Sequence, residues 1–232
     1  MFSYIILLFL LFLSLDAYMY IDGYIVSIAP AESYLDFSTN RFSRYLNLTY
    51  PNDKWHKEFS YHGANAYAYL LAKYGSSIDM ISIQLYESYT HAAYNITQLG
   101  VPPIDYLINF ISNLVVESNN NSTNFTNTDT NVRHGYMVNF EDDKSVKLHN
   151  QFVHVPIQKL VIGLANGWAL DNNEKHVYFS PDDLHKAYEI LLANKINPKG
   201  FMFWSIQLEG KNDIYFAKSL NKIMHIRKSD IS

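Results

Sequence analysis

The chain has 232 residues, 48% of them hydrophobic, which is enough for one domain with a sizeable core. Its 18 basic and 22 acidic side chains give a formal charge of −4 without a basic stripe, so no nucleic-acid partner is expected. The absence of cysteine excludes disulfides and thiolate metal sites.

The N-terminal segment begins with an apolar run over residues 5–15, whose length matches the hydrophobic part of a secretory signal. We expect residues 1–17 to be a signal or hydrophobic N-terminal segment that ends near Ala17. No Lys or Arg precedes the run, so a buried element or a misplaced start is the alternative. Five Asn-x-Ser/Thr sequons also favour a secreted glycoprotein: Asn47, Asn95, Asn120, Asn121 and Asn124.

Four short apolar runs predict the buried strands of a parallel sheet. They cover residues 24–29 (YIVSIA), 79–85 (DMISIQL), 160–165 (LVIGLA) and 200–207 (GFMFWSIQ). The runs are continuous rather than strictly alternating, which is typical of strands covered on both faces.

Helical patterns lie between or after these runs. They cover residues 64–74, 103–116, 181–193 and 214–225. In the third of them Ser180 is the expected N-cap and Pro181 the first helical residue. The alternation of strands and helices predicts an α/β fold with a parallel sheet.

Two insertions interrupt this alternation. Residues 118–132 are polar and of low complexity, and we expect them to be disordered because they offer little apolar surface to bury. Residues 135–140 and 147–155 flank a charged turn and predict a β-hairpin ahead of the third strand.

Side chains alternate across a strand, so sequence position predicts which of them share a face. On the second strand the apolar set should face the helices, and Ser82, Gln84 and Tyr86 should face the other way. On the fourth strand Met202 and Trp204 share a face. A buried pair such as Gln84 and Tyr86 needs partners, because an unsatisfied polar group costs about 1–3 kcal/mol. The pair is therefore either a structural network or part of a ligand site.

Four segments together resemble strands of family 18 glycoside hydrolases, which include chitinases and endo-β-N-acetylglucosaminidases. They are SIAPAE from Ser27, DMISIQLYE from Asp79, GLA from Gly163 and GFMFWS from Gly200. The resemblance covers about residues 24–225. It implies a chitinase-type (β/α)₈ TIM barrel, of which residues 18–232 would supply about strands five to eight as a partial barrel.

The same resemblance implies a binding site for β-1,4-linked N-acetylglucosamine polymers. Gln84 and Tyr86 resemble the pair that contacts the N-acetyl group and the reacting sugar. Trp204 resembles the indole that floors the subsite of the cleaved sugar, and Met202 resembles its inner-wall neighbour. The alternative for Trp204 is a core aromatic side chain.

The catalytic signature of that family, DxxDxDxE, is absent from the sequence. In the family its final Glu is the general acid, and the preceding Asp orients the substrate's own N-acetyl oxygen as the nucleophile. Because loss of general acid help costs about 10²–10⁴-fold in rate, we expect the chain to be inactive. Glu32, Glu87 and Glu209 follow strand ends and are weak candidates for a substitute acid, by raising one another's pKa. For Glu87, binding of a sugar hydroxyl is the alternative.

No cofactor or metal site is expected. The 9 histidines are scattered without metal-ligand spacing, and no phosphate-binding loop or nucleophile elbow is present. A half-barrel would expose two sheet edges, so the chain is a fragment of a longer protein, a degenerate paralogue, or a half that self-associates or needs a partner. Its possible functions are therefore hydrolase, chitin-binding lectin or non-functional remnant.

Overall fold

The computed structural model of the chain describes residues 25–44, 65–87, 90–115, 135–171 and 176–225. The expected signal at 1–17 and the polar insertion at 118–132 lie outside these residues, as do all the sequons except the one at Asn95. Within the described part of the chain, no helix has the length and apolar character needed to span a membrane.

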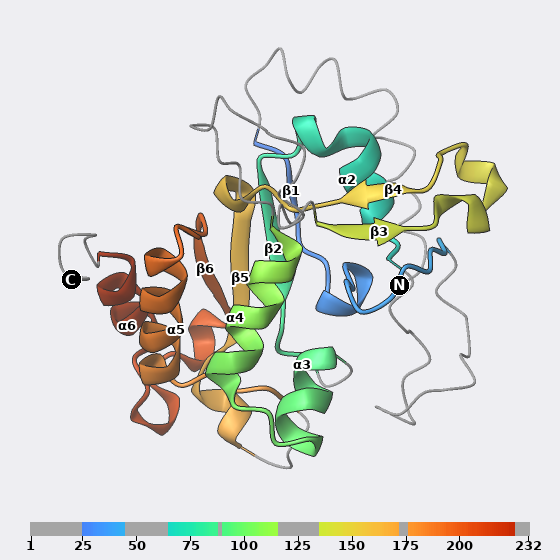
Figure 1. Cartoon of the computed structure of the whole chain (residues 1–232). Helices are drawn as coiled ribbons and strands as arrows, with labels where there is room; N and C mark the ends of the chain where they lie inside the picture. Colours follow the sequence, from blue (N-terminus) through green and yellow to red (C-terminus); the bar gives the residue numbers. More distant parts are fainter. Residues whose placement is uncertain (1–24, 45–64, 88–89, 116–134, 172–175, 226–232) are drawn as a thin grey trace.

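The described fold is built on a four-stranded parallel sheet with the strand order β1-β2-β5-β6 (Figure 1). The strands are β1 (Ser27–Ile28), β2 (Met80–Gln84), β5 (Leu160–Ala165) and β6 (Gly200–Trp204). Each neighbouring pair is parallel. The predicted α/β class, the parallel sheet and its four strands are therefore confirmed.

Three strands are shorter than the apolar runs that predicted them, β2 by one residue at each end and β1 and β6 by more. β1 ends before Pro30, which lacks the N–H needed to continue a ladder, and only an isolated bridge from Ala31 to Gln84 follows. β6 ends at Trp204 instead of residue 207, because the chain turns into a short 3-10 helix at Ile206–Leu208.

Three helices pack side by side against the sheet: α4 (Pro103–Leu114), α5 (Pro181–Ala193) and α6 (Phe216–Met224). In Figure 1, α4 crosses in front of β2 and β5, while α5 and α6 lie beside β6. The predicted start of α5 is confirmed, since the Ser180 hydroxyl accepts a hydrogen bond from the Asp183 N–H at 3.0 Å.

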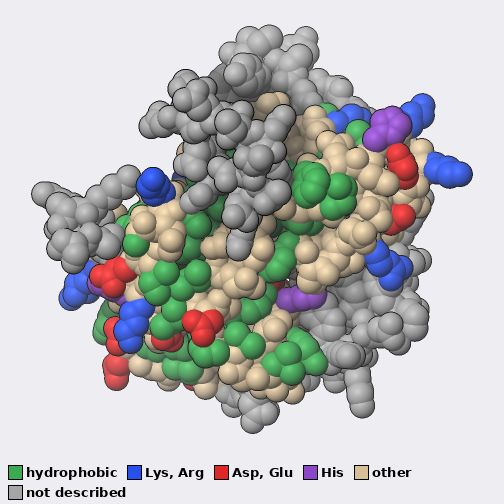
Figure 2. Space-filling view, viewed as in Figure 1, with side chains coloured by type: hydrophobic (Ala, Val, Ile, Leu, Met, Phe, Trp, Pro, Cys, Tyr) green, Lys and Arg blue, Asp and Glu red, His purple; other side chains and the backbone are tan. Residues whose placement is uncertain are grey.

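A hairpin of β3 (Tyr136–Val138) and β4 (Gln151–Val153) precedes β5, as predicted. It packs on α2 (Ala68–Tyr74), and its far end carries acidic and basic side chains together, at the upper right of Figure 2. Gly135 has a φ of +81°, and a Cβ on it would lie 2.1 Å from the Val153 carbonyl oxygen. A residue with a side chain could not begin this hairpin without moving the backbone.

One α-helix of the described residues was not predicted: α3 (His91–Ala93), which continues as a turn of π-helix over Tyr94–Gln98. Its first turn is capped by Thr90, whose hydroxyl accepts a hydrogen bond from the Ala93 N–H at 3.0 Å. The segment is too short for a helical period to stand out, so only a cap residue marked it.

The two faces of the sheet differ in what they pack against. The apolar residues Ile81, Ile83 and Leu85 are at most 1% exposed and belong to the main core beneath the helices. The predicted division of β2 into a helix-facing set and an opposite set is therefore confirmed for these residues. We call the opposite side of the sheet the second face; it carries Ser82, Gln84, Tyr86, Val161, Gly163, Ala165, Met202 and Trp204.

Candidate functional site

The predicted sugar-binding side chains occupy two adjacent rows of the second face. Gln84 pairs with Gly163, which pairs with Met202, so these three form one row across β2, β5 and β6. Two positions further along, Ala165 pairs with Trp204 in the next row. The parallel register thus places the predicted residues of β2 and β6 at the carboxyl end of the sheet, where active sites of parallel α/β folds form.

The first row depends on a glycine at its centre. A Cβ on Gly163 would lie 3.1 Å from the Met202 sulfur and 3.2 Å from the Gln84 Cα. Because residue 163 has no side chain, Met202 can lie across β5 towards β2.

Tyr86 belongs to a small apolar cluster on this side of the sheet. It is 6% exposed and lies with Ala165 and Ala169, against which Trp168 and Met202 also pack. Burial, together with the nearby charge of Glu87, raises the pKa of Tyr86 to about 12. The phenol therefore stays protonated at neutral pH and can donate a hydrogen bond.

The Gln84 amide has a structural partner. Its Nε2 donates to the Ala29 carbonyl oxygen at 2.8 Å. This bond uses one of the two N–H donors of the amide and ties β2 to the loop that follows β1. Gln84 thus belongs to a structural network, while the other amide N–H is not used by this bond.

Trp204 has an exposed indole on a fixed backbone. The residue is 58% exposed, so it is not a core side chain of the described fold. The Trp168 indole N–H donates to the Trp204 carbonyl oxygen, and the Asn166 amide donates to the Ser205 carbonyl oxygen at 3.0 Å. The loop after β5 therefore holds the main chain from which the Trp204 side chain projects.

The loops after β5 and β6 are joined to each other. Asn212 donates to the Gly167 carbonyl oxygen at 2.8 Å and to the Asp171 carboxylate at 2.9 Å. Lys211 forms an ion pair with Asp171. A Cβ on Gly167 would lie 2.2 Å from the Lys211 carbonyl oxygen, so the close approach of the two loops requires glycine there.

His176 contacts both the Trp168 ring and the Tyr86 backbone. Its ring lies 4.7 Å from the Trp168 ring in an edge arrangement, and its Nδ1 lies 3.3 Å from the Tyr86 carbonyl oxygen. Sequence reasoning did not single out Asn166, Trp168 or His176. A tryptophan three residues past a strand end, as in GLANGW, was the one available signal for Trp168.

The three carboxylates considered as substitute acids lie in different surroundings. Glu32 is 2% exposed and contacts the helices α3 and α4. Glu209 accepts a hydrogen bond from the Ala217 N–H at 2.8 Å, in the first turn of α6. Glu87 follows Tyr86 in the sequence; burial raises its pKa, and the charge of His176 opposes that shift. Glu32 and Glu87 owe their raised pKa to burial and not to each other or to Glu209.

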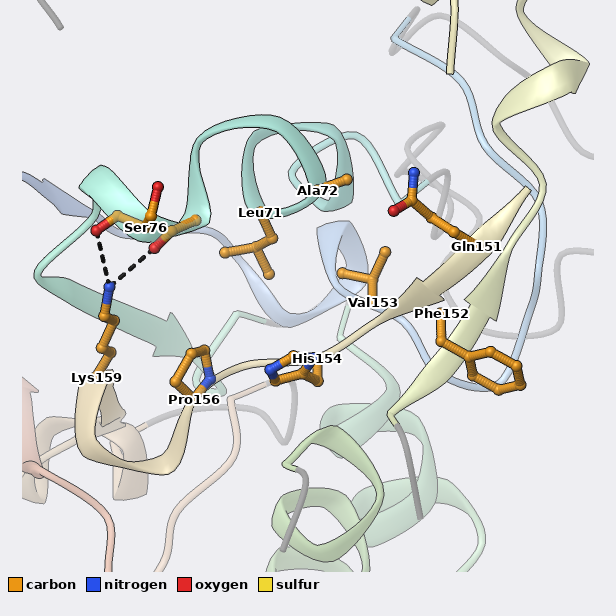
Figure 3. A pocket seen from close by; sticks show the side chains of 10 residues that line it. Leu71, Ala72, Ser76, Gln151, Phe152, Val153, His154, Pro156 and Lys159 are labelled. Carbon is orange, nitrogen blue, oxygen red and sulfur yellow. Dashed lines mark hydrogen bonds between the residues drawn. The ribbon is translucent and has the colours of Figure 1, made fainter. Parts of the chain in front are cut away.

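A separate pocket of about 330 Å³ lies at the opposite end of the sheet, between the end of α2 and β4 (Figure 3). It opens beside Lys159, which immediately precedes β5, whereas Trp204 pairs with Ala165 at the other end of that strand. The Lys159 ammonium donates to the carbonyl oxygens of Gly75 at 2.9 Å and Ser76 at 3.3 Å. The Lys159 ammonium is thus already bound to two carbonyl oxygens of the residues that line the pocket.

In the described ranges, no group of three or more His, Asp or Glu side chains is arranged to hold a metal ion. No protein-family model matches the sequence, and no curated protein matches it.

Proposed function

We propose that this chain binds β-1,4-linked N-acetylglucosamine polymers at the second face of its sheet and does not cut them. On this proposal the chain is chitinase-like, and β1, β2, β5 and β6 take the places of strands five to eight of a family 18 TIM barrel. The sequence resemblance supports this assignment, and the observed strand order is compatible with it.

The observation that carries the proposal is the exposed Trp204 indole on the second face, which also carries Tyr86 and Met202. An indole offers a flat apolar surface of the kind that packs against the C–H face of a sugar ring. The protonated Tyr86 phenol can donate to an amide carbonyl of the ligand. A flat floor and a hydrogen-bond donor on the same face of the sheet suit an acetamido sugar better than a charged or purely apolar ligand.

The absence of cutting follows from the positions of the carboxylates. Glu32 lies among helices and Glu209 caps α6, so neither is presented at the second face. With no DxxDxDxE run in the sequence, the leaving-group oxygen of a bound glycan lacks the family's proton donor. The protein would therefore act as a lectin.

The test is a calorimetric titration with chitotetraose of the parent, Trp204→Ala and Phe152→Ala. Phe152 is the matched control, because it is also a large aromatic residue, 55% exposed, on the distant hairpin. We expect Trp204→Ala to weaken binding by more than about tenfold, the scale of a tryptophan that anchors an interface. Equal affinity of the three proteins would exclude Trp204 as the floor. Failure of the parent to bind would leave the remnant hypothesis.

A hydrolase is the second candidate, and Glu87 is the observation that favours it. A partly buried carboxyl with a raised pKa, one residue after Tyr86, is suited to donate a proton. We expect no product from a chromogenic chitotriose substrate. Release that Glu87→Gln abolishes and Glu209→Gln retains would replace the lectin with an enzyme that uses Glu87.

A further inference from the structure

A second cluster of ionisable side chains lies on the helix side of the sheet, directly after β1. Glu32 is 2% exposed and Asp36 is 6% exposed. The His91 Nε2 lies 2.9 Å from one Asp36 carboxylate oxygen. The cluster therefore combines two buried carboxyl groups with one imidazole. When the imidazole is charged, the net charge of the cluster is zero only if one of the two carboxyl groups keeps its proton.

The two carboxyl groups differ in their hydrogen-bond partners, and Asp36 is the one that contacts the imidazole. One Asp36 oxygen accepts from the Ser38 N–H at 2.9 Å and from the Ser38 hydroxyl at 2.6 Å. The other oxygen faces His91. Each Asp36 oxygen thus has a hydrogen-bonding partner, and the partner of the second oxygen is the His91 imidazole.

Glu32 has neutral donors instead. Its Oε2 accepts from the Ala92 N–H at 3.0 Å, and its Oε1 accepts from the Tyr106 hydroxyl. Of the described groups, His91 and Asp36 are the charged ones that act on it, with opposite effects. Tyr136 is the remaining ionisable neighbour of the cluster; its hydroxyl bonds to the Asn65 side chain at 3.0 Å, and burial together with the charge of Asp36 keeps it protonated.

We propose that Glu32 holds a proton in the folded protein at weakly acidic pH, and that this proton is a latch that fastens the loop after β1 to α3 and α4. Loss of the proton at higher pH leaves a buried charge without its own counter-ion, and the loop loosens. The protein would be most stable, and its ligand site best ordered, at acidic pH.

The acid–base properties of the cluster agree with this arrangement. Burial raises the pKa of Glu32 to about 7, although His91, Tyr106 and Ala92 oppose the shift. Burial lowers the pKa of His91, but the hydrogen bond and charge of Asp36, together with Glu32, outweigh it and leave the pKa raised. Both groups therefore hold protons more tightly in the folded chain than in the unfolded one.

The latch also reaches the second face through residues 29–32. The Gln84 N–H donates to the Pro30 carbonyl oxygen at 2.9 Å, and the Gln84 amide donates to the Ala29 carbonyl oxygen at 2.8 Å. Glu32 follows in the same loop. Loosening this loop would release the Gln84 side chain, so glycan binding should weaken as pH rises; this last step rests on the proposed function.

The direction in which stability changes with pH follows from proton binding. The pKa of Glu32 is higher in the folded state than in the unfolded state, so its contribution is full below pH 4.5 and is lost as pH rises to about 7. The contribution of His91 is present below its unfolded pKa and is lost as pH rises through its raised folded pKa. Both contributions therefore decline with rising pH.

The test compares the thermal unfolding of the parent, Glu32→Gln and Glu141→Gln between pH 5 and pH 8. Gln mimics the protonated carboxyl, and Glu141 is the matched control because it pairs with His149 at 2.9 Å on the surface. For Glu32 we expect the folded-to-unfolded ratio of the parent to fall by up to about a hundredfold, or about 5–10 °C in Tm. Glu32→Gln should lack this fall and exceed the parent at pH 8, while Glu141→Gln should follow the parent.

Equal pH slopes for the parent and Glu32→Gln would overturn the proposal. If Glu32→Gln does not fold, Tyr106→Phe replaces it: because the Tyr106 hydrogen bond lowers the pKa of Glu32, its removal should move the stability loss to higher pH. An unchanged midpoint would also overturn the proposal. Chitotetraose titrations at pH 5.5 and pH 8 then test the link to Gln84. A parent that never binds would refute the proposed function while the melting curves still decide the latch.

Discussion

The Met202 side chain lies across Gly163, and its sulfur is 3.1 Å from the position that a Cβ on residue 163 would occupy. The same Cβ would lie 2.8 Å from the Ile83 carbonyl oxygen, which is backbone of the neighbouring strand. The Met202 sulfur could move aside, but the Ile83 carbonyl is held in the sheet. Gly163 is therefore required by the close approach of β2, and Met202 uses the space that the missing side chain leaves.

Replacing Gly163 with Ala should destabilise the fold by about 1–3 kcal/mol, the usual cost of overpacking a close-packed interior. Urea unfolding measures this loss directly. Gly75→Ala is the control, because a Cβ there meets nothing within 4 Å and the residue has right-handed helical angles. We expect it to be neutral or to stabilise by about 0.4–1 kcal/mol. Comparable losses for both variants would contradict the proposed steric cause.

Trp168→Phe should weaken glycan binding without touching the floor residue itself. The change keeps an aromatic ring against His176 but removes the N–H that donates to the Trp204 carbonyl oxygen. One neutral hydrogen bond contributes about 0.5–1.5 kcal/mol, so affinity for chitotetraose should fall about two- to tenfold in a calorimetric titration.

Tyr188→Phe provides the comparison for that variant. It also removes one hydrogen bond, from the Tyr188 hydroxyl to the Asn197 side chain at 2.9 Å, but on the helix side of the sheet. Both variants should lose similar stability, and only Trp168→Phe should lose affinity. Loss of affinity in both would mean that binding follows overall stability instead of the backbone support of Trp204.

Glu209 should matter for the stability of α6 and not for proton donation. Its carboxylate accepts from the Ala217 N–H, so Glu209→Ala removes a cap and should cost about 0.5–2 kcal/mol in thermal or urea unfolding. Glu209→Gln keeps an acceptor and loses only the charge at the helix N-terminus, so it should cost less. Gln as harmful as Ala would show that the hydrogen bond is not what Glu209 contributes.

The sheet could be predicted because its signal is local. Ile81, Ile83 and Leu85 recur with the period of a strand, and all three lie in the main core. The hairpin and the N-cap of α5 also follow from short stretches of sequence. Shared strand parity placed Met202 and Trp204 on one face, and the parallel register brought them level with Gly163 and Ala165.

The rest depends on contacts between distant parts of the chain. Tyr106, the partner of Glu32, is 74 residues away, so the position of Glu32 after a strand end gave no sign of its burial. The support of Trp204 likewise comes from residue 168, 36 positions earlier. Strand-end position therefore grouped three carboxylates that the fold separates into a buried cluster, a helix cap and a residue that follows Tyr86.

The close approach of Gly167 to the Lys211 backbone has a consequence for any attempt to give this scaffold a new ligand. Libraries that randomise the chain after β5 would mostly yield misassembled loops if position 167 were varied. Diversity placed at Ile206 and Gln207, which are exposed beside Trp204, would leave that junction untouched. The close approach of Gly167 to Lys211 thus determines which neighbouring positions can be varied.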